Sequence, residues 1–414
     1  MYKYAELYFN PLAFDATIQE GGDLMPKGFK VSAIETGARY KKRLDLGLIK
    51  ADKFCGGAAV FTRNICRAAP ILWSVDKVDT GSAILVNAGQ ANAQTGDKGL
   101  YHCESLAETL APLLGLKTHE VLLASTGVIG VPLNIEAITS ALDALVKKLG
   151  DKGFCDFASA IMTTDTKRKA YTAIGTLPNG TAYQVNACAK GSGMIAPNMG
   201  TMLAFILTDL KITSEALTAL LEEVTLETFN RITVDGDTST NDSVFIMSSG
   251  AVDTNIIDDP NSKEALSFKG VLYELMMRLA LDIVADAEGG TKVVRILVQG
   301  ATTAQEADSI ARTIANSNLV KTAFYGEDPN WGRILAAMGR SGAFFHPIQV
   351  SLDLDAVPWV RNGLDNGKDE EAKKVLKKDY YTLKVTLTNG YGERSIWTSD
   401  LSLDYVKINS SYKS

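Results

Sequence analysis

The chain has 414 residues, of which 46% are hydrophobic and 22% are charged, and its formal net charge is -6. This length allows two or three domains with a sizeable core, and the composition is ordinary for a soluble globular protein. The acidic balance argues against a nucleic-acid partner and against an anionic membrane surface. We also expect no membrane-spanning helix, because the longest apolar runs, such as residues 202–207, are too short to cross a bilayer.

The residue types that often carry metal or redox chemistry are few and scattered. Residues 1–6 lack the basic-then-apolar order of a signal peptide. The five cysteines form an odd set at positions 55, 66, 103, 155 and 188, which is typical of free thiols in a reducing compartment, so we expect a cytoplasmic protein. The three histidines, at positions 102, 119 and 346, have no metal-ligand spacing. We therefore expect neither a metal site nor a Ser-His-Asp triad.

Strand-like runs alternate with amphipathic helical patterns, which predicts a mixed α and β protein. In the first two thirds of the chain, the expected elements are a strand over 120–124 that ends in the turn Ser125-Thr126-Gly127, helices over 134–149 and 213–232, a strand over 244–248 and a helix over 263–287. Asn134 is a suitable cap for the first of these helices, and Thr213 or Ser214 for the second. The third helix should stop before Gly289-Gly290.

The last third continues the alternation with a strand over 292–298, a helix over 304–316, a strand over 319–324, and strand-like alternation over 380–408 that contains a turn at Asn389-Gly390. The charged segment 366–378 is the clearest linker candidate, and we interpret it as a solvated loop or an exposed helix. We place a domain boundary near Gly289-Gly290.

A glycine-rich stretch meets a short apolar run at the bond between Gly200 and Thr201. Gly200 has no Cβ that would hinder attack on its carbonyl by the Thr201 hydroxyl, so an N-to-O acyl shift could cut the chain here. Thr201 would then carry both a hydroxyl nucleophile and an α-amine that can act as its base. A purely structural Gly-Thr pair before a strand is the commoner alternative when the residues are considered alone.

Several short motifs follow one another along almost the whole chain. They are Ser125-Thr126-Gly127, Thr163-Thr164-Asp165-Thr166, and the segments 190–204, 235–242, 288–292, 328–333 and 407–412. In this order, and with Gly200-Thr201 inside the third of them, they resemble the ornithine acetyltransferase family of arginine biosynthesis, also called the glutamate N-acetyltransferase or ArgJ-type family.

The resemblance implies a layered αββα fold with an N-terminal threonine nucleophile, of the DmpA/ArgJ-like type, followed by a smaller C-terminal α/β domain. We expect a catalytic region over 1–288 and a C-terminal domain over 289–414 whose tail returns to the active site. Self-cleavage would give an alpha chain, 1–200, and a beta chain, 201–414. The family also implies a heterotetramer of two alpha and two beta chains.

The activity that the resemblance implies is acetyl transfer from N-acetylornithine to glutamate through an acetyl-threonine. Neither a nucleic-acid partner nor a cofactor is expected, and the sequence leaves open whether acetyl-CoA also serves as an acetyl donor. By resemblance, Thr201 is the nucleophile, and Thr126 and Gly127 form the oxyanion hole. The implied substrate-binding residues are Thr163, Lys190, Thr201, Glu288, Asn409 and Ser414. Gly200 stands where the family usually has alanine.

Other interpretations of these residues are an amidase or aminopeptidase with the same N-terminal nucleophile, or an uncleaved binding protein. Two further motifs imitate known sites. Residues 191–196 imitate a dinucleotide-binding loop, but Pro197 would interrupt the helix that such a loop requires. Residues 235–246 imitate a calcium-binding loop but lack its glycine and its final glutamate, so we expect a hydrogen-bonded turn there.

Overall fold

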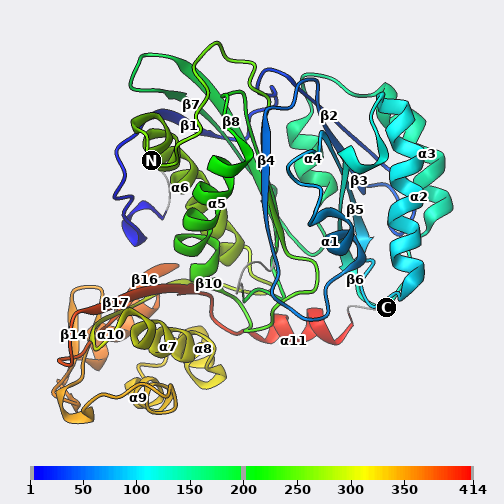
Figure 1. Ribbon diagram of the computed structural model, residues 1–414. Helices are drawn as coiled ribbons and strands as arrows, with labels where there is room; N and C mark the ends of the chain where they lie inside the picture. The colour runs from blue at the N-terminus through cyan, green and yellow to red at the C-terminus, as the bar shows by residue number, and fades with distance from the viewer. Residues whose placement is uncertain (1–3, 197–201, 412–414) are drawn as a thin grey trace.

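The computed structural model describes residues 4–196 and 202–411 of a mixed α/β protein with three sheets (Figure 1). Each of the three sheets combines parallel and antiparallel strand pairs, which confirms the mixed α and β class predicted from the sequence. Two of the sheets lie face to face in one part of the molecule, and the third forms a separate part below them in Figure 1.

The six-stranded sheet has the order β1-β7-β8-β9-β11-β4, and only its β9–β11 pair is parallel. Its strands are β1 (Asp15–Glu20), β4 (Gly56–Phe61), β7 (Lys169–Thr176), β8 (Ala182–Lys190), β9 (Leu203–Thr208) and β11 (Ser243–Ser248). Strand β9 is buried on both faces, with Ala204 and Ile206 in one core and Leu203, Phe205 and Leu207 in another. This double burial explains why β9 is a continuous apolar run in the sequence.

The four-stranded sheet has the order β2-β3-β5-β6, so β6 is an edge strand. Its strands are β2 (Phe29–Ile34), β3 (Leu46–Ala51), β5 (Ala83–Gln90) and β6 (Val121–Val128). Helices α1 (Ala69–Ser74), α2 (Asp97–Leu114) and α3 (Ile135–Lys147) form a core with one face of this sheet. Its other face shares a core with the six-stranded sheet and α4 (Phe154–Ala160).

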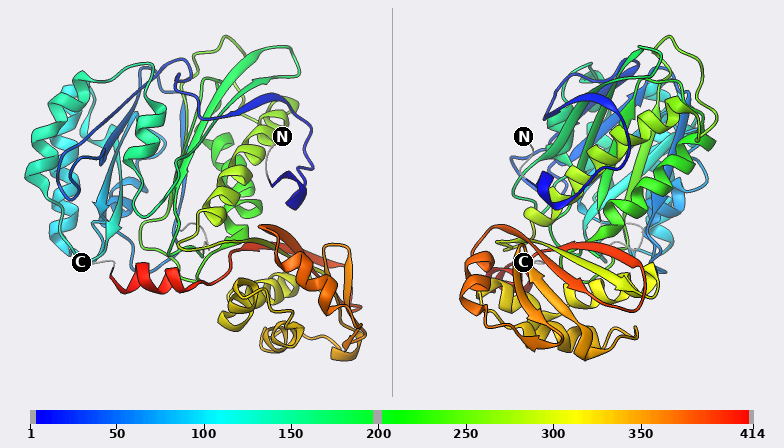
Figure 2. Two further views of the ribbon diagram at one scale, coloured as in Figure 1. Left: turned by 180° about the vertical axis from the view of Figure 1, so that it is seen from behind. Right: turned by 90° about the vertical axis from the view of Figure 1, so that its left-hand side faces the viewer.

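Helices α5 (Ser214–Glu227) and α6 (Lys263–Ala285) cover the outer face of the six-stranded sheet. The order of layers is therefore helices, six-stranded sheet, four-stranded sheet, helices, and Figures 1 and 2 show these layers from different sides. Single 3-10 turns occupy Ala5–Leu7, Thr118–Glu120, Phe229–Arg231 and Pro347–Gln349.

The seven-stranded sheet has the order β10-β17-β12-β16-β13-β14-β15. Its strands are β10 (Ile232–Thr233), β12 (Val293–Ala301), β13 (Ser351–Leu354), β14 (Val357–Arg361), β15 (Leu364–Asp365), β16 (Tyr380–Thr386) and β17 (Gly392–Thr398). The helices that accompany it are α7 (Ala304–Ala315), α8 (Asn318–Tyr325), α9 (Trp331–Gly339) and α10 (Asp369–Leu376). The last helix, α11 (Leu403–Ser410), runs back along the end of the two stacked sheets (Figure 2).

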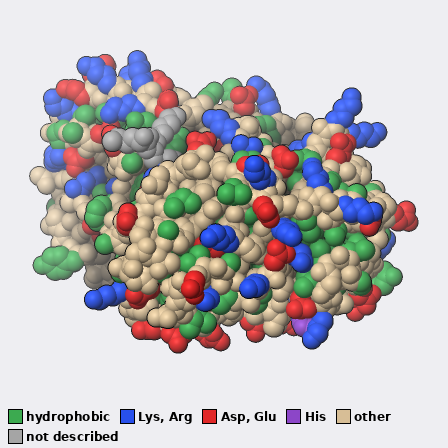
Figure 3. All heavy atoms as spheres, turned by 90° about the horizontal axis from the view of Figure 1, so that it is seen from above, with side chains coloured by type: hydrophobic (Ala, Val, Ile, Leu, Met, Phe, Trp, Pro, Cys, Tyr) green, Lys and Arg blue, Asp and Glu red, His purple; other side chains and the backbone are tan. Residues whose placement is uncertain are grey.

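Most of the helices and strands expected from the sequence are present. The Asn134 side chain caps α3 by accepting from the Ala137 N–H at 3.3 Å, and the Thr213 hydroxyl caps α5 by accepting from the Ala216 N–H at the same distance. All five cysteines are free thiols. Within residues 4–196 and 202–411, no helix combines the length and apolar character needed to span a bilayer. Basic and acidic side chains are interspersed on the face shown in Figure 3.

Three predictions about the last third and one about the first half are wrong. Residues 319–324, predicted as a strand, lie in α8, because Val320, Ala323 and Phe324 are buried on one helical face; a short apolar run does not distinguish the two structures. The segment 366–378 is not a linker. Its residues 369–376 form helix α10, one of the two structures predicted for it, and α10 buries Ala372 and Val375 in the core of the seven-stranded sheet.

The other two errors concern where strands end. The turn at Asn389-Gly390 falls between β16 and β17, as predicted, but the strand-like alternation does not continue to residue 408, because residues 403–408 belong to helix α11. Ser125-Thr126-Gly127 is not a turn after a strand, because these residues belong to β6 itself. Strand β6 continues there because its partner β5 extends equally far, to Gln90.

Phe205 lies in the core between the two stacked sheets. Its ring is parallel to that of Phe245, at a centroid distance of 5.6 Å, and meets the ring of Phe157 edge-on at 5.2 Å. Replacing Phe205 with alanine should lower the free energy of unfolding by about 3–5 kcal/mol, because a buried aromatic side chain leaves a cavity. The measurement is urea unfolding of the wild type and the variant.

The matched control is Phe344→Ala, because Phe344 is 63% exposed. This variant should change the free energy of unfolding by less than about 0.5 kcal/mol. Equal losses in the two variants would contradict the placement of Phe205 in the core.

Candidate active site

One cavity of about 330 Å³ collects most of the residues singled out in the sequence. The predicted site residues that line it are Thr126, Gly127, Thr163, Lys190, Glu288 and Asn409. The other lining residues are Val128, Ile129, Thr164, Gly193, Met194, Met202, Leu203, Ser239, Asn241 and Asp242. Gly200, Thr201 and Ser414 lie outside the described residues, and Met202 follows Thr201 directly in the sequence.

The edge of β6 supplies backbone groups to this cavity. Side chains from α1 occupy the outward-facing groups at the beginning of the strand: Trp73 Nε1 donates to the Val121 carbonyl at 3.0 Å, and Ser74 Oγ accepts from the Leu123 N–H at 2.9 Å. Because alternate residues of a strand direct their N–H groups to the same side, the Gly127 N–H points to this edge too. Gly127 lines the cavity, so an N–H donor of an edge strand faces it.

The backbone at Gly127 requires glycine. Its φ is +127°, and an added Cβ would lie 2.5 Å from the carbonyl oxygen of Gly89 on the neighbouring strand β5. This conformation and this close approach exclude side chains. Glycine therefore lets β5 and β6 stay in contact up to the cavity.

Lys190, the last residue of β8, is buried and is held in place by the 163–165 segment. Its Nζ donates to the Thr163 hydroxyl at 2.7 Å and lies 3.6 Å from Asp165 Oδ2. The Asp165 carboxylate also accepts from the Thr163 N–H at 3.0 Å and from the Gly191 N–H at 2.6 Å. One carboxylate thus fixes the lysine and the two backbone segments beside it.

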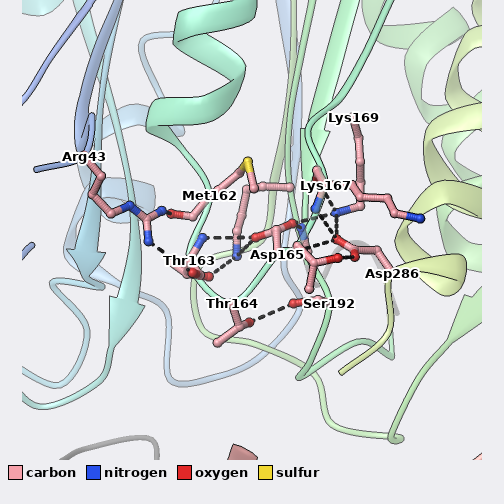
Figure 4. A network of polar contacts seen from close by, with 12 residues as sticks. Arg43, Met162, Thr163, Thr164, Asp165, Lys167, Lys169, Ser192 and Asp286 are labelled. Carbon is pink, nitrogen blue, oxygen red and sulfur yellow. Dashed lines mark hydrogen bonds and ion pairs between the residues drawn. The ribbon is translucent and has the colours of Figure 1, made fainter. Parts of the chain in front are cut away.

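The Asp165 carboxylate belongs to a longer buried network (Figure 4). Lys169 Nζ donates to Asp165 at 2.8 Å and to Asp286 at 2.6 Å, and all three side chains are less than 5% exposed. Asp286 also accepts from the Thr166 N–H at 3.0 Å and from the Thr166 hydroxyl. Because Asp286 directly follows α6, this network attaches the end of α6 to the segment that holds Lys190.

Ionisation in this network follows from its charges. Burial alone would raise the pKa of Asp165, but the Lys190 and Lys169 ammonium groups outweigh burial and hold that pKa well below its usual range. Burial alone would lower the pKa of Lys169, and Asp165 and Asp286 outweigh it, so that pKa is raised. Asp165 and Lys169 therefore stay charged at neutral pH.

Glu288 also lines the cavity and is positioned by contacts with Ser192 and Asn409. Its N–H donates to the Ser192 carbonyl at 3.0 Å, and its carboxylate accepts from Asn409 Nδ2 at 2.7 Å. A Cβ on Gly193 would lie 2.5 Å from Glu288 Cδ, so the carboxylate occupies space that only glycine leaves open. The helix before Glu288 ends at Ala285, two residues earlier than predicted.

The segment that follows β10 is a hydrogen-bonded turn, as predicted from the sequence. Asp235 accepts from the N–H groups of Met194 and Ile195 at 2.7 and 2.9 Å, and from the Tyr405 hydroxyl at 3.1 Å. Since Tyr405 belongs to α11, this carboxylate fastens both the segment before residue 197 and the helix that carries Asn409.

The structure thus brings together six of the predicted site residues, from β6, the 163 loop, β8, the segment after α6, and α11. The sequence reasoning missed Asp165, Lys169, Asp286 and Asn241. Asp165 and Asn241 lie inside motifs singled out in the sequence, but the motifs alone do not show that the contacts of Asp165 reach β8 and, through Lys169, the end of α6. Lys169 lies only four residues after Asp165, but its second partner, Asp286, is distant in the sequence, so no sequence pattern indicates that these three side chains meet.

The sequence matches the profile of the ArgJ family over residues 30–414. The arginine biosynthesis bifunctional protein ArgJ of Desulfotalea psychrophila is 47% identical over 393 residues, which cover 94% of this chain and 99% of that protein. The corresponding protein of Geobacter sulfurreducens is 44% identical over 391 residues, with the same two coverages.

Two solved structures are also similar. A chain of the arginine biosynthesis bifunctional protein ArgJ from Bacillus halodurans has a TM-score of 0.49 and 40% identity, and the match covers 51% of this chain and 100% of that one. The ornithine acetyltransferase from Mycobacterium tuberculosis, complexed with ornithine, has a TM-score of 0.41 and 30% identity, over 44% of this chain and 98% of that one.

The sequence matches define an acyltransferase of arginine biosynthesis. The chain belongs to the ArgJ family. The family resemblance seen in the sequence motifs is thereby confirmed, and so is the expectation of an acetyltransferase.

The charged network makes a prediction about stability. Asp165→Asn should lower the free energy of unfolding at pH 7 by about 3–5 kcal/mol, because the buried Lys190 loses its carboxylate partner and the buried Lys169 loses one of its two. The folded-state pKa of Asp165 is depressed, so its contribution is present above the unfolded value of about 3.9 and is lost as the pH falls through the folded value. The difference between wild type and variant, measured by urea unfolding, should therefore shrink below about pH 4.

The control is Asp143→Asn, which removes the partner of Lys147 in a pair whose side chains are 62% and 74% exposed. That substitution should change stability little at any pH. A wild-type advantage over Asp165→Asn that stays constant down to pH 3 would contradict the assignment of a charged Asp165 to this network.

Proposed function

We propose that this chain is a self-processing acetyltransferase that moves the acetyl group of N-acetylornithine to glutamate through an acetyl ester of Thr201. The observation that carries this proposal is that six of the predicted site residues line one cavity, together with Met202. These six are Thr126, Gly127, Thr163, Lys190, Glu288 and Asn409. A covalent acetyl intermediate is reasonable here, because it divides amide transfer into two easier steps.

The charges at the cavity suit an amino-acid substrate. Lys190 offers an ammonium group to a substrate carboxylate, and Glu288 offers a carboxylate to a substrate ammonium group. The Asn409 amide beside Glu288 adds a neutral donor. Thr163, which accepts from Lys190, limits where that ammonium group can lie. We assign substrate binding to these residues together with Thr201 and Ser414.

The transfer follows from ordinary acyl chemistry. The Thr201 α-amine takes the proton of the Thr201 hydroxyl, whose oxygen attacks the acetyl carbonyl of N-acetylornithine. The oxyanion that forms is stabilised by the Gly127 N–H and by Thr126. Its collapse breaks the C–N bond, and the ornithine amine leaves with the proton. The amine of glutamate then attacks the acetyl ester, which yields N-acetylglutamate and restores the threonine.

Self-cleavage would use the same Thr201 hydroxyl. Attack of the Thr201 hydroxyl on the Gly200 carbonyl gives an ester, and its hydrolysis yields an alpha chain, 1–200, and a beta chain, 201–414. We propose that these chains form the layered αββα fold of an N-terminal-threonine enzyme and assemble as a cytoplasmic heterotetramer. The layer order and the buried position of β9 support the fold assignment.

Two further assignments belong to this proposal. A catalytic region over 1–288 and a C-terminal domain over 289–414 agree with a separate core formed by buried residues from Val294 onwards. Acetyl-CoA is proposed as a second acetyl donor, since the curated relatives are named bifunctional. This alternative donor would deliver its acetyl group to the same threonine, and no other cofactor is needed.

Thr201→Ala should abolish self-cleavage and lower turnover by about 10⁴-fold, because the nucleophile and its hydroxyl proton are lost. Denaturing gels and mass spectrometry should find fragments 1–200 and 201–414 in the wild type and an intact variant. Turnover is measured with N-acetylornithine and glutamate, and separately with acetyl-CoA as the sole donor. Thr201→Ser is the conservative control and should keep part of both reactions.

An intact wild-type chain with full activity would contradict the N-terminal nucleophile. Rapid consumption of N-acetylornithine without glutamate would instead favour an amidase, in which water is the acceptor.

Gly193→Ala tests the position of Glu288. The added Cβ would displace the Glu288 carboxylate, whose far end is flexible enough to move without unfolding the protein. We expect the KM for N-acetylornithine to rise about 10- to 100-fold, the loss of one hydrogen bond to a charged group, with little change in kcat. Gly339→Ala in α9 is the control, because a Cβ there would meet nothing within 4 Å. An unchanged KM in Gly193→Ala would contradict the role of Glu288.

A further inference from the structure

The outward row of backbone groups on β6 continues past the contacts with α1, and a side chain from the segment before β11 contacts its next position. Asn241 Nδ2 donates to the Ser125 carbonyl at 2.8 Å. In the alternation of β6, the next outward group after this carbonyl is the Gly127 N–H. The Asn241 amide therefore lies at the position immediately before the proposed oxyanion donor.

The same amide also holds the neighbouring strand. Asn241 Nδ2 donates at 2.6 Å to the carbonyl of Ala91, directly after β5. The Ala91 N–H in turn donates to the Val128 carbonyl at 3.0 Å. Both donor hydrogens of one amide are thus used on backbone carbonyls at the end of the β5–β6 pair, on either side of Gly127. Asn241 is 7% exposed, so water competes little for these hydrogen bonds.

Asn241 is also held by hydrogen bonds within residues 239–243, which lead into β11. Its N–H donates to the Ser239 hydroxyl at 3.1 Å, and its Oδ1 accepts from the Thr240 hydroxyl at 2.7 Å. Two residues later, the Ser243 N–H donates to the Met202 carbonyl at 2.9 Å, where β11 begins its parallel pairing with β9. Asn241 is therefore fixed to the strand pair that follows Thr201 in the sequence.

We propose that Asn241 is a positioning residue that sets the separation between the Gly127 N–H and the reacting threonine. Gly127 belongs to β6 of the four-stranded sheet, and Thr201 precedes β9 of the six-stranded sheet in the sequence. The Asn241 side chain and the Ser243 N–H together connect these two sheets at the cavity. An oxyanion donor contributes only when it lies at hydrogen-bond distance from the oxygen in the transition state. Loss of the Asn241 contacts should therefore impair the chemical step and leave substrate binding intact. This inference rests on the proposed acetyltransferase function.

The test compares Asn241→Ala and Asn241→Asp with the wild type, using N-acetylornithine and glutamate. In the second variant a carboxylate of the same size faces two carbonyl oxygens, so the contacts are lost without a cavity. We expect kcat to fall about 10- to 100-fold in both variants, somewhat less than for removal of a donor itself, while the KM for N-acetylornithine changes less than about threefold. Rates are expressed per processed chain, quantified on denaturing gels.

Asn186→Ala is the matched control. Asn186 is fully buried in β8, and its Nδ2 also donates to a backbone carbonyl from a distant segment, that of Leu24 at 2.9 Å. It should lose stability in thermal unfolding as Asn241→Ala does, but keep the wild-type kcat. The inference is overturned if either folded Asn241 variant keeps its kcat, if the loss appears in KM, or if Asn186→Ala loses kcat equally. An inactive wild type would instead refute the proposed function.

Discussion

The buried sequence of charges Asp165, Lys169 and Asp286 is the constraint on which the site depends. It joins the segment before β7, the strand β7 itself and the end of α6. Hydrophobic packing is not directional, so it would fix the relative positions of these three segments less strictly. A shift by one residue in any of them would leave a charge buried without a partner, which is far more unfavourable than a lost apolar contact. Electrostatics therefore helps to fix the segments that bring Lys190 and Glu288 to the cavity.

The opposite wall of the cavity has a different origin. Strand β6 is an edge strand, and the protein covers its open side piece by piece, with Trp73 and Ser74 at one end and Asn241 at the other. Edge strands normally have to be protected from unwanted pairing. These contacts stop before Gly127, which lines the cavity and whose N–H is the proposed oxyanion donor. An uncovered position of an edge strand and a proposed catalytic group therefore coincide.

The sequence predicted local structure and the family well, but it could not predict the contacts that assemble the site. The caps at Asn134 and Thr213 could be predicted because a helix cap is a local interaction that depends on only a few residues. The role of Asp165 depends on its ion pairs with Lys169 and Lys190. These lysines lie at the ends of two strands, and the order of strands in the sheet brings both of them to Asp165. The short apolar run at 319–324 was predicted as a strand but is a helix. Strands and helices bury such runs equally well, so only the tertiary contacts of residues such as Phe324 decide between them.

The strand order of the six-stranded sheet has a consequence for a chain cut after residue 200. Strands β9 and β11 would come from the second fragment, yet they lie between β8 and β4, which both come from the first. The two polypeptides would interleave within a single sheet, with a seam of main-chain hydrogen bonds on each side. Neither piece could leave without tearing the middle of the sheet, so the nicked molecule should melt as one cooperative unit and should not dissociate on dilution.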